Sequence, residues 1–189
     1  GRNIQVPIEA VKASSEGFSN DFVQDNVRDQ FRYTCWQPGS GDKNPSLTFT
    51  LTSEQTIRSV VISHGSARSG DWRSDAAEYT IQASTDGKNW SNVLKATGNS
   101  SQIAVHNIPE TTARYFRIVF TESQYDVPLE VADVKFLTAE VDFSDPGQQP
   151  ENPENPGISK ELVILLIVAA VCVCALTAFV ITVDVRRRK

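Results

Sequence analysis

The sequence contains no methionine among its 189 residues. Because translation starts at methionine, we expect Gly1 to follow a missing segment, so that the chain is the C-terminal part of a longer protein. Cysteine is also scarce, and two of the three cysteines, Cys172 and Cys174, lie within one apolar run. Only Cys35 precedes that run, so the rest of the chain has no internal disulfide. This scarcity favours a bacterial surface protein, because a secreted eukaryotic ectodomain of this size usually carries disulfides.

Basic patches and catalytic motifs are missing as well. The formal net charge is -5 at pH 7, so the chain lacks the basic face that binding to nucleic-acid phosphates requires. With two histidines, the spacing shows no Ser–His–Asp or Cys–His arrangement and no CxxC or HExxH metal motif. Nothing groups the carboxylates into the facing pair of a glycosidase. We therefore expect no enzymatic activity in this chain and no nucleic-acid partner, with any catalytic portion in the missing N-terminal part.

One long hydrophobic run is present, at residues 162–183, and it carries no charge. As a helix it would be about 33 Å long, which matches the ~30 Å hydrocarbon core of a bilayer. A buried helix in a soluble core rarely extends this far without a polar stripe. We predict a transmembrane helix with a basic cytoplasmic tail at 184–189, which ends in Arg186 to Lys189. The preceding chain would then lie outside the cell.

Residues 139–161 form the segment before this run, AEVDFSDPGQQPENPENPGISKE, and they hold four of the nine prolines. The segment has many acidic residues and little apolar surface to bury. Proline also removes backbone hydrogen-bond donors. We predict an extended, solvated Pro/Glu/Asn-rich spacer between a folded head and the membrane.

Residues 1–138 have the pattern of an all-β domain. Short runs rich in Val, Ile, Thr, Tyr and Phe are separated by turn residues. In 46–51 the apolar residues alternate, and Asp86-Gly87 predicts a hairpin because glycine accepts positive φ. We expect a β-sandwich of six to eight antiparallel strands. The predicted strands are 46–51, 57–63, 79–84, 101–108, 115–120 and 130–137.

Four stretches carry a family resemblance, and they are 26–36 (NVRDQFRYTCW), 79–90 (YTIQASTDGKNW), 113–118 (ARYFRI) and 129–136 (LEVADVKF). In this order they resemble the coagulation factor 5/8 type C, or discoidin, domain, and within it most closely carbohydrate-binding module family 32. The resemblance covers roughly residues 3–138 and implies a galactose-binding-like jelly roll. Vertebrate discoidin domains usually have a disulfide joining their two ends, which this sequence lacks, so the bacterial sugar-binding branch is favoured.

The resemblance implies a structural calcium ion. The family's site would here use Asp29, Thr34 and Asp133, with backbone carbonyls near Val27, Phe31 and Ala132. Two departures weaken this expectation, because Gln30 and Phe31 replace Gly-Asp and Asp133 replaces Glu. The alternative is a metal-free loop braced by hydrogen bonds from Asp29 and Thr34.

The resemblance also implies that loops at one end of the sandwich bind the ligand. Candidate loops are 37–44, 64–75 and 122–128. Arginine and histidine donors suit sugar hydroxyls, and a flat aromatic ring suits the C–H face of a sugar. The predicted ligand-binding residues are His64, Arg68, Trp72, Arg73 and Tyr125.

Each candidate has a plainer alternative. His64 could cap a strand end, Trp72 could cover the rim of the sandwich, and Arg68 and Arg73 could be solvated charges. Trp36 and Trp90 are expected in the core, and His106 is expected to be structural.

The function expected from these observations is non-catalytic binding of galactose-type or related glycans. The module would form the membrane-anchored end of a larger cell-surface protein, such as a glycoside hydrolase, of a Gram-positive bacterium. Two alternatives remain open. One is a protein- or lipid-binding discoidin-type adhesion domain, and the other is a structural stalk module.

Overall fold

The structure is a computed structural model that describes residues 4–17, 19, 22–31, 33–65, 75–123 and 129–144. These residues lie in one compact unit, Gly1–Gln149. The elements are the strands β1 (Ile8–Ala13), β2 (Ser46–His64), β3 (Ala76–Ser84), β4 (Ser91–Ala96), β5 (Ile103–Ser123) and β6 (Val131–Leu137), with one short 3₁₀ helix, η2 (Gln24–Arg28). The expectation of an all-β head is confirmed.

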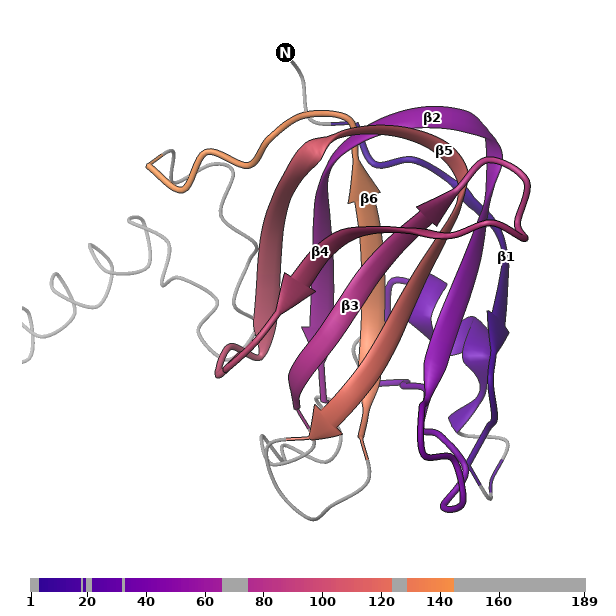
Figure 1. The fold of residues 1–189 in the computed structure, drawn as a ribbon. Coiled ribbons are helices and arrows are strands. Elements are labelled where there is room, and N and C mark those ends of the chain that lie inside the picture. Colours follow the sequence, from indigo (N-terminus) through magenta and orange to yellow (C-terminus); the bar gives the residue numbers. More distant parts are fainter. Residues whose placement is uncertain are drawn as a thin grey trace, which may run out of the picture. The chain divides into compact units, whose positions relative to one another are not determined.

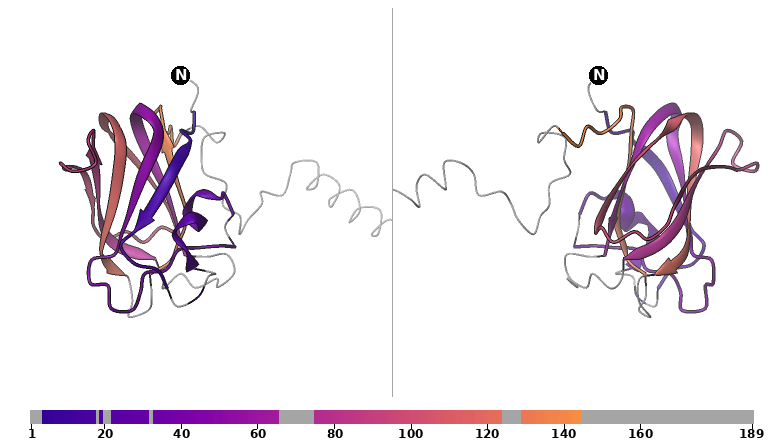
Figure 2. Two further views of the ribbon diagram at one scale, coloured as in Figure 1. Left: turned by 90° about the vertical axis from the view of Figure 1, so that its right-hand side faces the viewer. Right: turned by 60° about the vertical axis from the view of Figure 1, so that its left-hand side comes forward.

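Two long strands connect the two layers of the sandwich. The strand order is β1-β2-β5-β3-β4, and all pairings are antiparallel. β6 pairs with the second half of β2, from Ser59 to His64, whereas β1 pairs with the first half. β2 and β5 arch over one end of the molecule (Figure 1), so that the two halves of each strand lie in different layers. Figure 2 shows these layers from the side.

The arch explains a difference from the sequence prediction. Runs 46–51 and 57–63 were expected as two strands, but they are the two halves of β2. Likewise, 101–108 and 115–120 fall in or next to β5. The β2–β5 register shifts between Thr50 and Gln55 and again between Ile57 and Ser59. Such bulges bend a strand without ending its hydrogen-bonded pairing.

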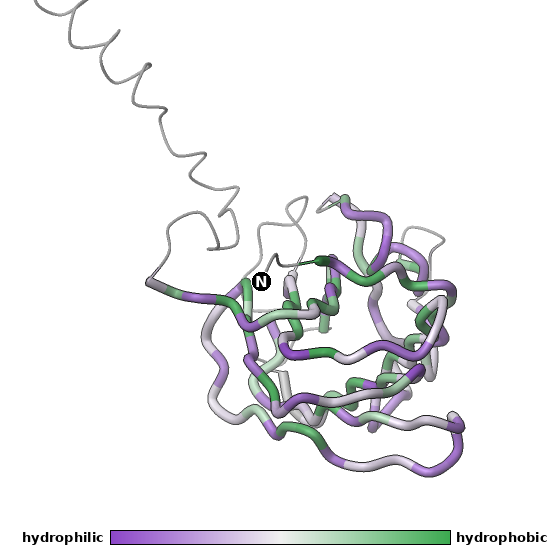
Figure 3. Tube along the Cα trace, turned by 90° about the horizontal axis from the view of Figure 1, so that it is seen from above, coloured by the Kyte–Doolittle hydropathy of each residue, from purple (hydrophilic) through white to green (hydrophobic). Residues whose placement is uncertain are grey.

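Alternating side chains build the core, which Figure 3 shows as alternating hydropathy along the trace. In β2, Leu47, Phe49 and Leu51 are fully buried. Phe136 of β6 joins the layers, because its ring centroid lies 5.2 Å from that of Phe49 and 4.9 Å from that of Phe116. Truncating such a buried ring to alanine typically costs about 3–5 kcal/mol, so this aromatic group holds the two layers together.

The structure also extends beyond the predicted end of the head. Residues 139–144, expected as the start of the spacer, are described, and Val141 is buried. Among the described residues no helix is long and apolar enough to cross a membrane. The predicted transmembrane segment 162–183, the tail and the remainder of the spacer lie outside the described residues.

Candidate functional site

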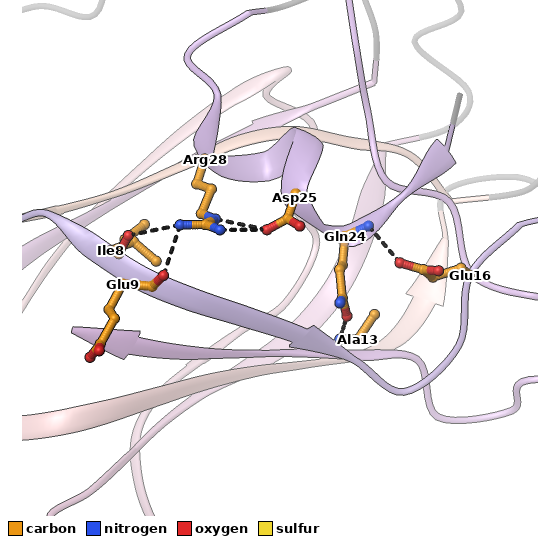
Figure 4. Close-up of polar contacts among 7 residues, drawn as sticks. All are labelled: Ile8, Glu9, Ala13, Glu16, Gln24, Asp25 and Arg28. Atoms are coloured by element: carbon orange, nitrogen blue, oxygen red, sulfur yellow. Dashed lines mark hydrogen bonds and ion pairs between the residues drawn. The ribbon is translucent and has the colours of Figure 1, made fainter. Parts of the chain in front are cut away.

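A short helix positions the loop of the predicted calcium site. Figure 4 shows how η2 is fastened to β1. Arg28 Nη1 donates to the carbonyls of Ile8 (3.1 Å) and Glu9 (2.9 Å), while Arg28 Nε donates to Asp25 Oδ1 at 2.8 Å. On the other side of the helix, Ala13 N donates to Gln24 Oε1 at 2.6 Å. Asp29 follows η2 directly, so these contacts fix where its carboxylate lies.

The loop after η2 brings together several hydrogen-bond acceptor oxygens and few donors. Asp29 Oδ1 accepts from Phe31 N at 2.7 Å. Thr34 Oγ1 lies 2.7 Å from Asp29 Oδ2 and 3.0 Å from the Phe31 carbonyl. A hydroxyl carries one proton, so it can satisfy only one of these two acceptors. One acceptor near Thr34 Oγ1 is therefore left without that proton, and a hard cation is the kind of partner that such oxygens accept.

Asp133 of β6 supplies the second carboxylate. Its residue is 4% exposed, and Oδ1 is buried without a hydrogen-bond partner among the described residues. Burial raises the pKa of Asp133 and the nearby Asp29 carboxylate adds to this, while Lys135, 3.5 Å from Oδ2, partly offsets it. A buried carboxylate oxygen without a hydrogen-bond partner requires an explanation, and a proton on the carboxyl group or a bound cation would each supply one.

The departures from the family pattern are partly compensated. Gln30 adopts the left-handed φ of 64° that glycine would otherwise supply, so the tight turn is retained. Phe31 brings no carboxylate, and its side chain is 66% exposed, but its carbonyl faces Thr34. In the described part of the chain, no three His, Cys, Asp or Glu side chains form a metal-binding group. The predicted residues offer two carboxylates, a hydroxyl and the Phe31 carbonyl, which are the kinds of oxygen donor that calcium takes.

His64 occupies the end of β2, where the second candidate loop begins. The residue is fully buried, and neither ring nitrogen has a hydrogen-bond partner among the described residues. Burial and the neighbouring His106 lower the pKa of His64 to about 3, so its ring is neutral. A buried neutral imidazole without partners is costly unless a further group completes its hydrogen bonds. Its backbone N–H donates to the Gln102 carbonyl at 2.7 Å.

Tyr79 separates the two histidines. Its ring centroid lies 5.4 Å from that of His64, and its hydroxyl lies 2.6 Å from His106 Nε2. Burial raises the pKa of Tyr79 and lowers that of His106. His106 therefore has a structural partner in the described residues, as the sequence suggested, whereas His64 does not.

Two acidic residues at the candidate loops are buried, which the sequence reasoning did not predict. Asp75, just before β3, is 2% exposed, and Glu130, just before β6, is 8% exposed. The Glu130 carbonyl accepts from Gly65 N at 2.8 Å, next to His64, and Glu130 Oε1 lies 3.4 Å from Gln37 Nε2. Their positions at the candidate loops could have drawn attention to them. Their burial could not be predicted from the spacing of residues in the sequence.

The first candidate loop, 37–44, is tied to the chain after β1. Asp42 Oδ2 accepts from Ser15 Oγ at 2.6 Å, and Ser15 Oγ accepts from Gly39 N at 3.0 Å. Burial acts to raise the pKa of Asp42, but the hydroxyls of Ser14 and Ser15 and the Asn44 N–H together lower it. The other predicted ligand residues, Arg68, Trp72, Arg73 and Tyr125, lie outside the described residues and stay predictions.

The two tryptophans expected in the core have different environments. Trp36 is fully buried, and its indole N–H donates to the Ser15 carbonyl at 2.8 Å. Trp90 is only half-buried, and the Arg117 guanidinium carbon lies 4.3 Å from its ring centroid. Trp36 confirms the expectation, whereas Trp90 is not a fully buried core residue, because its ring lies against the partly exposed Arg117 side chain.

Solved structures share this fold. A family 32 carbohydrate-binding module of Clostridium perfringens, in complex with GalNAc-β-1,3-galactose, matches with a TM-score of 0.60 and 19% identity, covering 69% of this chain and 94% of that one. The family 32 module of AlyQ, bound to 4,5-unsaturated mannuronic acid, matches with a TM-score of 0.61 and 22% identity, covering 72% and 99%. A chitosan-binding module from Paenibacillus sp. matches with a TM-score of 0.59 and 23% identity, covering 67% and 92%.

Sequence comparison gives the family assignment. A search of curated proteins found no match. The family model for the F5/8 type C domain matches residues 10–131, which is more than half of the chain. That range contains the hairpin of β3 and β4, the ARYFRI run of β5 and the loop of Asp29 and Thr34. The chain belongs to the F5/8 type C domain family.

Proposed function

We propose that this chain is a non-catalytic carbohydrate-binding module that recognises galactose-type or related glycans at the loop end of its sandwich. The observation that carries the proposal is His64, a buried, neutral imidazole whose two nitrogens have no partner in the described residues. One sugar hydroxyl could donate to the unprotonated ring nitrogen and a second hydroxyl could accept from the protonated one, which would complete the hydrogen bonds of the ring. The carbohydrate-binding modules among the structural neighbours support this proposal.

The ligand site would combine His64 with Arg68, Trp72, Arg73 and Tyr125 of the adjoining loops. Trp72 would stack on the C–H face of the sugar, and the two arginines would donate to its hydroxyls. A protein- or lipid-binding adhesion domain is the main rival. It predicts binding to a protein or a vesicle without any glycan, whereas a stalk module predicts no binding.

Calcium would serve this module by fixing loops. We propose that Asp29, Thr34 and Asp133 hold the ion together with the Phe31 carbonyl, because Asp29, Thr34 and the Phe31 carbonyl meet in one loop and Asp133 Oδ1 is buried without a partner among the described residues. The ion's chemistry there would be structural, with no part in a reaction. Residues 162–183 would anchor the module in the membrane of a Gram-positive cell surface and leave the head outside, which multiplies weak single contacts by clustering.

A glycan array probed with the purified full chain tests the ligand proposal. We expect galactose- or N-acetylgalactosamine-terminated glycans to bind and Trp72→Ala to lose at least about tenfold in affinity, because one aromatic stacking platform is removed. Tyr33→Ala is the matched control, since Tyr33 is 69% exposed on the loop of Asp29 and Thr34. An array without any bound glycan, or equal binding by the Trp72→Ala chain, would overturn the proposal.

A further inference from the structure

A row of polar side chains crosses the outer face of the larger layer. The cross-strand register places Lys12 of β1 opposite Thr48 of β2, Thr48 opposite Arg117 of β5, and Arg117 opposite Gln82 of β3. Gln82 in turn lies opposite Asn92 of β4. These residues alternate with fully buried neighbours such as Phe116 and Ile118, so they all point away from the core. With neighbouring strands about 4.8 Å apart, the row is about 19 Å long.

The middle of this polar row is held in one arrangement. Arg117 Nε donates to Gln82 Oε1 at 2.8 Å, and Gln82 Nε2 donates to Asn92 Oδ1 at 2.8 Å. The Trp90 ring stacks on the Arg117 guanidinium, 4.3 Å from its central carbon. Arg117 is therefore presented with its Nε and one flat face already engaged, while its terminal nitrogens remain available as donors. A preorganised donor loses less side-chain entropy when a ligand binds.

Positive charge dominates this outer face. Lys12 is exposed at one edge strand, Arg117 is half-buried near the centre, and Lys95 is exposed on β4, the other edge strand. Glu78 of β3 is an acidic residue on this face, and the register places Glu122 of β5 opposite it, at the end of the sheet away from Lys12. The charge pattern contrasts with the chain as a whole, which has a formal net charge of -5.

The surroundings of the three cations suit hydroxyl-rich ligands. Hydroxyls and amides lie between the charges, and Figures 1 and 2 show the strands β3 and β4 at the surface with η2 against the far edge, beside β1. At the rim, Arg114 is already paired with Glu9 at 3.0 Å, so that pair adds no net charge. The polar residues between the charges are Thr48, Thr80, Gln82 and Asn92.

We propose that this outer sheet face binds an anionic polysaccharide whose chain lies across the strands. Carboxylates repeated along a uronic-acid chain would meet cations at both edges and at the centre, whereas a single sugar could reach only one of them. The hydroxyl groups between the carboxylates would bond to the threonine and amide side chains. This site is separate from the loop end that contains His64, and it does not depend on the galactose-type site proposed above.

Polygalacturonate binding by the purified full chain tests this proposal, with fully methyl-esterified polygalacturonate as the uncharged form of the same polymer. We expect the acid form to bind, the ester to bind much more weakly, and the affinity for the acid form to fall as salt is raised. The double variant Lys12→Glu/Lys95→Glu should bind at least about tenfold more weakly, because two attractive charges become repulsive. The variant Arg117→Gln should also weaken binding.

The matched control is Lys43→Glu/Arg58→Glu, which makes the same change in net charge at residues outside this face. We expect it to bind polygalacturonate like the unmodified chain. Equal losses in the two double variants, or no binding at all, would overturn the proposal. Competition by free galactose, or loss of polygalacturonate binding in Trp72→Ala, would place the anionic chain at the loop end and also overturn it. Galactose binding that persists in Lys12→Glu/Lys95→Glu separates the two sites, whatever the outcome at either one.

Discussion

The side-chain amide of Asn107 and the backbone of Val141 are joined by two reciprocal hydrogen bonds. Asn107 Oδ1 accepts from Val141 N at 2.9 Å, and Asn107 Nδ2 donates to the Val141 carbonyl at 3.1 Å. Ser59 Oγ lies 2.7 Å from Asn107 Oδ1 and 2.8 Å from the Ala139 carbonyl. The chain that leaves β6 is thereby fixed to the first half of β5, and Val141 is 4% exposed.

This contact predicts the effect of Asn107→Ala. The change removes both hydrogen bonds to Val141, so we expect the free energy of unfolding to fall by about 1–2 kcal/mol. Asn107→Asp keeps an acceptor for Val141 N but loses the donor to the Val141 carbonyl. Its free energy of unfolding should therefore lie between those of the unmodified chain and Asn107→Ala. Urea unfolding measures both variants. Asn92→Ala, at an exposed amide, should cost about 0.5 kcal/mol or less, and an equal loss in Asn92→Ala and Asn107→Ala would contradict the prediction.

His64 predicts how stability depends on pH. Its pKa is about 3 in the folded chain, below the ordinary histidine value of 6.5, because burial disfavours the charged ring. The unfolded chain therefore binds a proton that the folded chain does not. Stability from this residue is full above about pH 6.5 and falls as the pH is lowered towards 3, by up to about 1.4 kcal/mol per pH unit.

Urea unfolding of His64→Gln between pH 4 and 7 checks this dependence. Glutamine cannot titrate, so the slope between these pH values should be smaller than in the unmodified chain. The neighbouring His106 also has a lowered pKa, and His106→Gln serves as the comparison for its share of the slope. Identical slopes for the His64→Gln chain and the unmodified chain would show that His64 is not held neutral.

The proposed calcium site predicts opposite effects of Asp133→Asn with and without the metal. Without calcium, the raised pKa of Asp133 shows that burial disfavours its charge, so a neutral amide should leave stability unchanged or increase it. With calcium, the unmodified chain should gain about 2.7 kcal/mol at a concentration 100 times the dissociation constant, and Asp133→Asn should gain little. Thermal unfolding in calcium and in EDTA gives both results.

Glu78→Gln removes a carboxylate from the outer sheet face and is the control for Asp133→Asn. It should retain the full calcium-induced shift of the unfolding temperature. A full shift in Asp133→Asn would exclude Asp133 as a ligand, and the absence of a shift in the unmodified chain would leave the loop braced by Asp29 and Thr34 alone.

Arg28 predicts an indirect effect on the same site. Its guanidinium bonds to two β1 carbonyls and to Asp25, and it contacts none of the three proposed ligand side chains. Arg28→Lys places all its donors on one nitrogen, so it cannot reproduce the geometry in which Nε bonds to Asp25 and Nη1 to the two carbonyls. We expect the loop of Asp29 to loosen and calcium to bind more weakly, by isothermal titration, while the far-ultraviolet circular dichroism is unchanged. Unchanged calcium affinity would show that η2 is held by its other contacts.

The β3–β4 hairpin predicts the effect of a single methyl group. Gly87 has a φ of 71°, and a Cβ there would lie 3.6 Å from the Tyr115 ring, an ordinary contact. Gly87→Ala should therefore cost about 1–2 kcal/mol from the left-handed backbone alone. Gly41→Ala meets no atom within 4 Å and is the control. It should be neutral or slightly stabilising in the same urea titration.

Local sequence patterns predicted much of the head. The alternation of Leu47, Phe49 and Leu51 identified a buried face, and the Asp86-Gly87 pair identified the hairpin, because both depend on residues within one strand or turn. The strand β1, IEAVKA, was missed because it has little β-branched character and is a strand by pairing with β2. The strand β4 was missed for a similar reason, since SNVLKA pairs as an edge strand with β3.

For the candidate sites as well, the features set within one loop could be predicted from the sequence, and those set by the packing of distant strands could not. Asp29 and Thr34, which the sequence motif placed in one loop, are joined by a hydrogen bond, as the metal-free alternative expected, while their role as calcium ligands stays a prediction. The burial of His64, Asp75 and Glu130 depends on how separate strand ends meet, and no spacing rule reports it.

The sequence by itself determined the strand periodicity, the hairpin and the family motifs, because each depends on neighbouring residues or on residue type. Only the tertiary structure decided that β2 and β5 bend across both layers, that Asp133 faces the loop of Asp29, and that Lys12, Arg117 and Asn92 share one outer face. The physical reason is that these relationships depend on bulges and cross-strand register. Both are set by packing between segments that are far apart in the chain.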